Sequence, residues 1–362
     1  MLKNIIFVDK NISLLAESLA GCGEVNTFEG RLLNSEMLAE AHCDYLFVRS
    51  TTKVTKELLN GTNVKFVGTA TSGTDHIDTD YLNSFGIIFA DAAGSNANSV
   101  AEYVIYAILK WSETNSFNIK DKKIGIIGYG NIGKLVAKYS LKLGLQVFVN
   151  DPPLFESGFS FPDSLHYSDL EHIFQNCDLI TNHVPLNFGG SHPTNKLINA
   201  QLISMLKNNA LFIHTSRGGV VDEYALYELI QNKNIYLSID VWENEPDFNT
   251  PLAGKSNIAT PHIAGYSYDG KLKGALAMAL AFERFSGEIP DYSIFNEELN
   301  KNKKLQDDSF RDSKLLYENL KLSRQIDRDT EDFLKLIDKF KEERKAGFDL
   351  LRKNYPKRRE IL

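Results

Sequence analysis

The chain has 362 residues, of which 43% are hydrophobic and 24% charged, and its formal net charge is −7. This length exceeds what one hydrophobic core usually supports, so we expect two or three domains. The apolar run before Asp9 is short, and no stretch reaches the ~18 apolar residues of a membrane span. We therefore expect a cytoplasmic protein without a signal peptide or a membrane contact.

Three cysteines are scattered along the chain, at Cys22, Cys43 and Cys177. Their number is odd, and their spacing lacks the close pairs that metal sites and disulfide frameworks show. We therefore expect buried reduced thiols and no metal site.

The first part of the chain alternates short apolar runs with segments of helical character. The runs are NIIFVD, DYLFVR, VKFVGTA and GIIFADA, and the pattern continues to about residue 95. This alternation predicts a parallel sheet covered by helices. From Ser99 to Phe117, apolar residues recur at three- and four-residue spacing, which indicates a long helix that crosses between domains.

A second α/β region starts at Lys122 and ends near Pro261. Its apolar strands are separated by helix-sized intervals, which is typical of a doubly wound sheet. Residues 270–287 form another predicted helix, which would return the chain to the first domain. We expect a discontinuous first domain (1–98 and 267–290), a doubly wound second domain (99–266) and a small third domain (291–362).

The C-terminal part differs in charge from the rest of the chain. Residues 301–362 carry 18 Lys and Arg against 13 Asp and Glu. The positive residues alternate with acids and follow a helical apolar stripe at Phe333, Leu336, Ile337 and Phe340. Because no nucleic-acid recognition motif accompanies this charge, we expect a solvated helix face or a subunit contact and no nucleic-acid binding.

A glycine-rich turn follows the predicted strand Ile124–Ile127. In GYGNIG, Gly128 would make the tight turn, Gly130 would let a pyrophosphate approach the backbone, and Gly133 would let helix and strand pack closely. Asn131 and Ile132 begin the following helix, whose free N–H groups would face the phosphates. The pattern predicts a dinucleotide site, but taken alone it is a weak signal, because an ordinary strand-to-helix turn can have the same glycines.

A dinucleotide site also needs a carboxylate at the end of the strand that follows the glycine turn and its helix. Asp151 follows the predicted strand Leu145–Asn150, 23 residues after Gly128, where it can accept hydrogen bonds from the adenosine ribose. It would also repel a 2′-phosphate, and Pro152 and Pro153 follow it where an NADP enzyme would place an arginine. We therefore predict NAD as the cofactor.

Three polar groups follow later strands of the same predicted sheet. Arg217 in SRGG offers a planar fork for a carboxylate, although a surface salt bridge would explain it equally well. Glu245 in DVWENEP and His262 in TPHIAGY could form an acid–base pair. An Arg, a Glu and a His at one sheet edge are the groups that hydride transfer from a hydroxy acid requires.

The order GxGxxG, Asp, SRGxxVD, DVWxxEP and PHIAG resembles the D-2-hydroxyacid dehydrogenase family. Segments 48–78, 150–153, 262–275 and 351–360 are more similar to the branch that oxidises a phosphorylated sugar acid for vitamin B6 biosynthesis than to the phosphoglycerate or lactate enzymes. The resemblance covers nearly the whole chain. It implies an NAD-dependent enzyme with a Rossmann-type nucleotide domain, a flavodoxin-like substrate domain and a C-terminal α+β or helical domain that forms a homodimer.

The resemblance also implies roles for individual residues. Arg217 would bind the substrate, and Glu245 with His262 would carry the proton. The implied contacts to NAD come from the GYGNIG turn and from Asp151, Val184, Asp240 and Gly265, and those to the substrate from Ser50, Thr71 and Tyr266. Val184 departs from the family, which usually has a threonine there, so only its backbone is expected to contribute.

Three questions stay open at this level. Arg49 and Lys53 flank Ser50, and they could either bind the substrate phosphate or serve as ordinary surface charges. The substrate could instead be another 2-hydroxy acid, such as phosphoglycerate or glyoxylate. A non-catalytic scaffold that senses NAD is the rival of a different class, but such a module would not need an acid–base pair.

Overall fold

A computed structural model describes residues 3–120 and 122–362. Met1, Leu2 and Asp121 lie outside this range. The chain forms two compact units: unit 1 comprises Met1–Asn96 and Ser267–Lys303, and unit 2 comprises Ala97–Tyr266 and Lys304–Leu362. The roles assigned to the three sequence domains stay predictions.

Unit 1 is a five-stranded parallel sheet in the order β2-β1-β3-β4-β5. Its strands are β1 (Ile5–Asp9), β2 (Glu24–Phe28), β3 (Tyr45–Val48), β4 (Phe66–Thr69) and β5 (Ile88–Asp91). Its helices are α1 (Leu15–Leu19), α2 (Ser35–Glu40), α3 (Lys56–Leu59), α4 (Thr79–Ser84), α12 (Tyr268–Ser286) and α13 (Ser293–Asn300).

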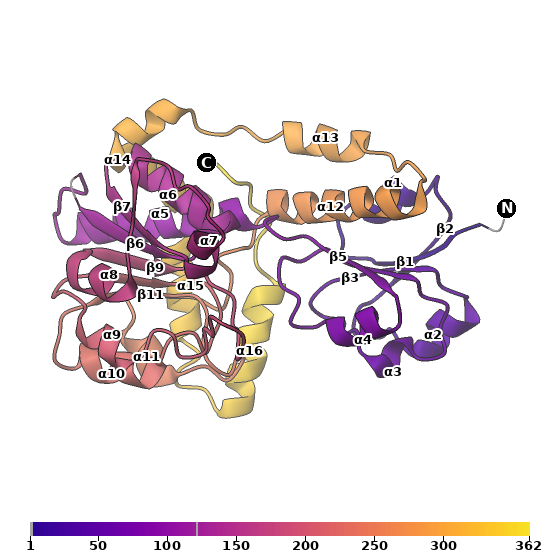
Figure 1. The fold of residues 1–362 in the computed structure, drawn as a ribbon, viewed down its shortest axis with the longest axis horizontal. Coiled ribbons are helices and arrows are strands. Elements are labelled where there is room, and N and C mark those ends of the chain that lie inside the picture. Colours follow the sequence, from indigo (N-terminus) through magenta and orange to yellow (C-terminus); the bar gives the residue numbers. More distant parts are fainter. Residues whose placement is uncertain (1–2, 121) are drawn as a thin grey trace. The chain divides into compact units, whose positions relative to one another are not determined.

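Successive side chains along each strand contribute to two hydrophobic cores, one on each face of this sheet. Ile6 and Val8 of β1 join a core with α1 and α12, whereas Phe7 between them joins a second core with α2, α3 and α4. Figure 1 shows α12 on one side of the sheet and α2–α4 on the other. Because successive side chains of a strand point to opposite faces, each short apolar run contributes to both cores.

Unit 2 contains a seven-stranded parallel sheet in the order β12-β11-β10-β9-β6-β7-β8. Its strands are β6 (Lys123–Ile127), β7 (Gln146–Asn150), β8 (Leu165–Tyr167), β9 (Leu179–Asn182), β10 (Leu211–His214), β11 (Tyr236–Ile239) and β12 (Ile258–Ala259). Its helices are α5 (Ala97–Thr114), α6 (Asn131–Lys142), α7 (Pro152–Glu156), α8 (Leu170–Asn176), α9 (Ala200–Ser204), α10 (Glu223–Ile230) and α11 (Thr250–Lys255), followed by η1 (Asp307–Arg311), α14 (Ser313–Arg324), α15 (Ile326–Leu334) and α16 (Lys341–Lys353).

The strand order confirms the predicted doubly wound nucleotide-type sheet. The chain moves outward from β6 through β7 to β8, and then returns to place β9 on the other side of β6. The switch point therefore lies between β6 and β9, where the carboxyl ends of open α/β sheets bind ligands. The short strand β8 was not predicted, because a three-residue run carries almost no periodic signal. The expected strand before His262 is β12, which has only two residues.

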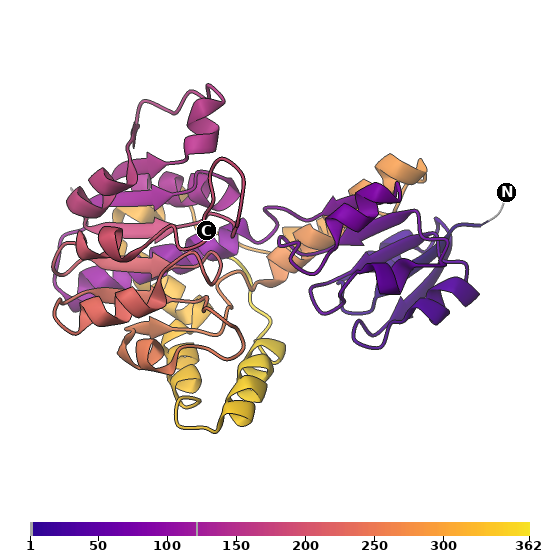
Figure 2. The same ribbon diagram turned by 60° about the horizontal axis from the view of Figure 1, so that its bottom comes forward.

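Residues 304–362 belong to unit 2 and form η1 and the helices α14, α15 and α16. Phe333 of α15 and Phe348 of α16 are fully buried, and their ring centroids lie 5.9 Å apart. Figure 2 shows α16 as a yellow helix beside α15. The predicted single apolar stripe is wrong in part, because α15 ends at Leu334 and Phe340 is 84% exposed at the start of α16.

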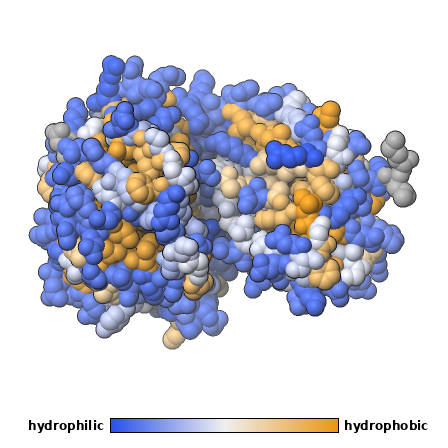
Figure 3. All heavy atoms as spheres, in the orientation of Figure 1, coloured by the Kyte–Doolittle hydropathy of each residue, from blue (hydrophilic) through white to orange (hydrophobic). Residues whose placement is uncertain are grey.

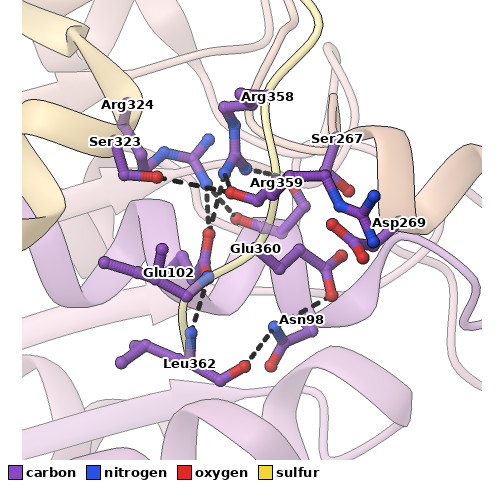
Figure 4. A network of polar contacts seen from close by, with 12 residues as sticks. Asn98, Glu102, Ser267, Asp269, Ser323, Arg324, Arg358, Arg359, Glu360 and Leu362 are labelled. Carbon is purple, nitrogen blue, oxygen red and sulfur yellow. Dashed lines mark hydrogen bonds and ion pairs between the residues drawn. The ribbon is translucent and has the colours of Figure 1, made fainter. Parts of the chain in front are cut away.

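A buried polar cluster anchors the end of the chain (Figure 4). Glu102 of α5 is fully buried, and its carboxylate accepts hydrogen bonds from Arg358 at 2.9 Å and from the backbone N–H of Leu362 at 2.9 Å. Arg324, which is also buried, forms an ion pair with Glu102 at 3.5 Å. The last residues of the chain are therefore part of the interior of unit 2.

The surface shows apolar patches within a mostly polar coat on the face seen in Figure 3. The three cysteines are free and buried. Within residues 3–120 and 122–362, no helix is both long enough and apolar enough to cross a membrane.

Candidate active site

Each glycine of the GYGNIG turn meets a different steric demand. Gly128 has φ +89, a conformation that L side chains rarely adopt. A Cβ on Gly133 would lie 2.1 Å from the carbonyl oxygen of Gly128, so helix α6 can approach β6 only with glycine there. A Cβ on Gly130 would meet no atom within 4 Å. The open space at Gly130, the N-cap of α6, fits the close approach of a pyrophosphate.

Asp151 connects the glycine turn to the strand that follows α6. One carboxylate oxygen accepts the backbone N–H of Tyr129 at 2.7 Å, and the other caps α7 by accepting the N–H of Leu154 at 3.1 Å. The side chain is half-buried, so it keeps a face open to solvent. This arrangement is compatible with hydrogen bonds from ribose hydroxyls.

Val184 lies directly over the first glycine. One of its methyl groups is 3.0 Å from the position that a Cβ on Gly128 would occupy. Val184 follows β9, the strand on the other side of the switch point from β7. Both walls of the predicted cofactor site are thus formed by loops at the carboxyl edge of the sheet.

Glu245 and His262, which are 17 residues apart, form a hydrogen-bonded pair. A Glu245 carboxylate oxygen lies 2.8 Å from Nδ1 of His262, and the other oxygen accepts the backbone N–H of Trp242 at 2.9 Å. Burial favours the neutral form of Glu245, but the charge and the hydrogen bond of His262 outweigh it and hold the pKa of Glu245 below its usual value. The carboxylate therefore stays ionised beside the imidazole.

The loop that carries His262 is held by Asp240. This carboxylate is buried and accepts hydrogen bonds from the Thr260 hydroxyl at 2.6 Å and from the backbone N–H groups of Ile263 at 2.8 Å and Ala264 at 2.9 Å. Burial raises the pKa of Asp240. Since both oxygens face the loop, the geometry gives Asp240 a clear part in holding His262, while its predicted contact with NAD stays a prediction.

Arg217 lies in a turn that packs against the segment carrying Glu245. A Cβ on the next residue, Gly218, would lie 2.0 Å from the carbonyl oxygen of Trp242, so only glycine permits this approach. Gly219 follows with φ +87. The two glycines of SRGG therefore bring the backbone of the Arg217 turn next to the backbone of the Glu245 segment.

Two histidines beneath this edge were missed from the sequence. Burial lowers the pKa of His214 to about 3 and that of His183 to about 3, so both rings are neutral near pH 7. Nδ1 of His214 lies 3.0 Å from the Asn182 amide. His214 ends β10, and a lone histidine at a strand end carries no signal that distinguishes it from a core residue.

The predicted substrate residues of unit 1 follow adjacent strands. Ser50 comes after β3 and is exposed, and Thr71 comes after β4, which pairs with β3. The Thr71 hydroxyl lies 2.8 Å from that of Thr69. Arg49 forms an ion pair with the buried Asp9 at 3.2 Å, so part of its charge is already matched.

Tyr266 has neighbours from the C-terminal region that sequence reasoning did not place at the site. The Tyr355 ring lies edge-on to it at 5.6 Å, and the guanidinium of Arg352 lies 5.9 Å from its centroid. The sequence resemblance implies only a part in dimerisation for the segment LRKNYPKRRE. The segment begins 85 residues after Tyr266, so the sequence carries no local signal for this contact.

Comparison with known proteins identifies the family. Residues 100–264 match the D-isomer specific 2-hydroxyacid dehydrogenase family, NAD binding domain. A Pseudomonas entomophila protein named erythronate-4-phosphate dehydrogenase is 37% identical over 99% of this chain and 92% of its own length. One of the same name from Pseudomonas putida is 38% identical over 99% of this chain and 93% of its own length. The chain belongs to the erythronate-4-phosphate dehydrogenases, a branch of this family.

Solved structures support the wider family and its fold. A D-lactate dehydrogenase from Aquifex aeolicus, complexed with NAD and lactic acid, is 25% identical, with a TM-score of 0.62 over 83% of this chain and 98% of its own. An NAD-bound 3-phosphoglycerate dehydrogenase from Entamoeba histolytica is 25% identical, with a TM-score of 0.65 over 80% and 97%. The family match and these NAD complexes agree with the glycine turn, and NAD is the cofactor.

Proposed function

We propose that the protein oxidises 4-phospho-D-erythronate to (R)-3-hydroxy-2-oxo-4-phosphooxybutanoate with NAD, as a step of pyridoxal phosphate (vitamin B6) biosynthesis. The observation that carries the chemistry is the 2.8 Å contact between Glu245 and His262 at the carboxyl edge of the nucleotide-type sheet. The relatives named above, which match 99% of the chain, support the choice of substrate.

In this proposal His262 is the general base. Its neutral Nε2 takes the proton of the C2 hydroxyl, and Glu245 stabilises the imidazolium through Nδ1. Bound NAD supplies the hydride acceptor. Arg217 binds the substrate carboxylate through its planar fork, with Ser50, Thr71 and Tyr266 as further substrate contacts. Positioning of the C2 carbon supplies much of the rate, because hydride transfer needs two carbons held close and aligned.

The GYGNIG turn, Asp151, Val184, Asp240 and Gly265 are the proposed NAD contacts. The preference for NAD over NADP rests on Asp151, whose negative charge would repel a 2′-phosphate. Its half-buried carboxylate is fixed by Tyr129 and Leu154, so it cannot readily turn away.

The decisive assay compares 4-phospho-D-erythronate with 3-phosphoglycerate, glyoxylate and D-lactate. The three hydroxy acids are tested with oxidised NAD and with oxidised NADP, and glyoxylate is tested with the reduced forms. A strong preference for the first acid with NAD is expected. Greater activity on another acid would move the substrate but keep the mechanism. No turnover of any acid, with NAD still bound, would favour a scaffold that senses NAD.

A homodimer and a cytoplasmic location belong to the same proposal. Leu315 and Leu322 of α14 are 55% and 76% exposed and lie seven residues apart, on one helix face. This face suits a subunit contact. Removing the whole C-terminal region would be a poor test, because Phe333 and Phe348 belong to the core of unit 2. Leu315→Asp/Leu322→Asp should instead halve the mass measured by light scattering, and an unchanged mass would reject this face.

A further inference from the structure

Arg352, in the last turn of α16, lies beside the proposed reaction site. Its guanidinium carbon is 5.9 Å from the ring centre of Tyr266 and 5.8 Å from that of Phe348. Phe348 is fully buried and fixes α16 to the core of unit 2. Two aromatic rings therefore hold this cation near the loop that follows His262.

The hydrogen-bonding capacity of Arg352 is not used up by the protein. Its Nε is buried and has no hydrogen-bond acceptor among the described residues. Both oxygens of Glu245 are already engaged, one by His262 and the other by the backbone of Trp242. A buried N–H donor without an acceptor costs free energy, and an anion that accepts its hydrogen bond removes that cost.

The surroundings of Arg352 keep it charged. Burial disfavours the cation, but Tyr266 and the carboxylate of Glu245 outweigh it and raise the pKa of Arg352. The group is therefore a permanent positive charge.

We propose that Arg352 binds the phosphate group of the substrate. The inference rests on the proposed function, in which Arg217 takes the carboxylate of the same acid. A 2-hydroxy acid with one anionic group needs one guanidinium, whereas a phosphorylated acid has a second anion that suits the bidentate fork of another arginine. The unused donor and the adjacent Tyr266 place this second cation at the site.

The test compares 4-phospho-D-erythronate with D-erythronate, which lacks only the phosphate. The measured quantity is the ratio of kcat/KM for the two acids. Arg352→Met keeps the packing volume but removes the charge, and should lower this ratio on the order of 100-fold, the effect of losing a charged hydrogen bond. Arg352→Lys keeps the charge but loses the fork, and should give an intermediate ratio.

Arg344 provides a matched control on the same helix. Its guanidinium lies 5.9 Å from the ring of Phe248 and pairs with Asp247 at 3.0 Å, so it is also a cation held on an aromatic ring. Arg344→Met should leave the ratio unchanged. NAD affinity and melting temperature, measured for every variant, report whether the fold is intact.

Two outcomes would overturn the proposal. One is an unchanged ratio in Arg352→Met. The other is an equal loss on both acids together with a displaced pH profile, which would mean that Arg352 acts through Glu245.

Failure of the proposed function looks different, because the wild type would then not prefer the phosphorylated acid. In that case inorganic phosphate becomes the probe, in the presence of NAD. Phosphate that raises the melting temperature of the wild type but not of Arg352→Met supports the anion site, and an equal rise in both rejects it.

Discussion

Arg324 donates a hydrogen bond from Nη2 to the carbonyl oxygen of Ala264 at 3.0 Å. Ala264 lies two residues after His262, and its own N–H is held by Asp240 at 2.9 Å. The loop of the proposed general base is thus held on one side by the nucleotide-type sheet and on the other by the end of α14. The C-terminal region therefore supports the reaction site directly, whatever part it takes in subunit contact.

The buried charge of Glu102 should be essential for stability. Glu102→Gln would leave Arg324 and Arg358 without their shared carboxylate, and we expect a loss of about 3–5 kcal/mol in the free energy of unfolding. Chemical denaturation measures this loss. Asp332→Asn is the control, since Asp332 forms a surface pair with Lys335 at 2.6 Å and should change stability by less than about 1 kcal/mol. Equal effects of the two changes would contradict the role given to the cluster.

Substitutions at two glycines of the same turn should have different effects, one on NAD binding and the other on stability. Gly130→Ala meets open space, so it should unfold within about 0.5 kcal/mol of the wild type but bind NAD about tenfold more weakly. Gly133→Ala places a methyl group 2.1 Å from the Gly128 carbonyl oxygen and should cost about 1–3 kcal/mol of stability. Calorimetric titration with NAD and thermal melts distinguish them. Normal NAD affinity in Gly130→Ala would place the pyrophosphate elsewhere.

His262→Ala should lower kcat by about 10²–10⁴ while NAD affinity changes little, because the imidazole acts on the proton rather than on the cofactor. Glu245→Gln keeps an acceptor for the Trp242 N–H but removes the negative charge, and should lower kcat by a smaller factor. Since the two groups act as one unit, the double variant should be no slower than His262→Ala alone. Multiplied losses in the double variant, or full turnover in His262→Ala, would refute the pair as the proton carrier.

Glu223 should make stability depend on pH. Burial raises the pKa of Glu223 from 4.5 to about 7, so the native state keeps a proton that the unfolded chain releases near pH 4.5. The free energy of unfolding should therefore fall as pH rises from about 4.5 to 7, by on the order of 3 kcal/mol from this group.

Glu223→Gln removes that titration and keeps an acceptor for the Glu243 N–H, which lies 2.6 Å away. The free energy of unfolding of the variant minus that of the wild type should be larger at pH 8 than at pH 5. Glu228→Gln, on an exposed position of the same helix, should show no such gain. A pH dependence that Glu223→Gln leaves intact would show that another group causes it.

Much of the cofactor site could be predicted because its constraints are local. Gly128, Gly133 and Asp151 belong to one strand–helix–strand unit, in which backbone geometry restricts the residues at fixed offsets. Glu245 and His262 follow neighbouring strands, so the parallel sheet brings them to one edge without further information. Their contact of 2.8 Å agrees with that expectation.

The tertiary structure decided what joins distant parts of the chain. No spacing in the sequence indicates three of the contacts described above, because each depends on how α14, α15 and α16 pack on the sheet. These contacts are Glu102 with Arg358, Arg324 with Ala264, and Arg352 with Tyr266. From the sequence the same arginines are only members of a charged tail. Spacing along the chain indicated the doubly wound sheet, the glycine turn and the acid–base pair. Long-range packing determined that Arg352 of the C-terminal helix α16 lies next to Tyr266.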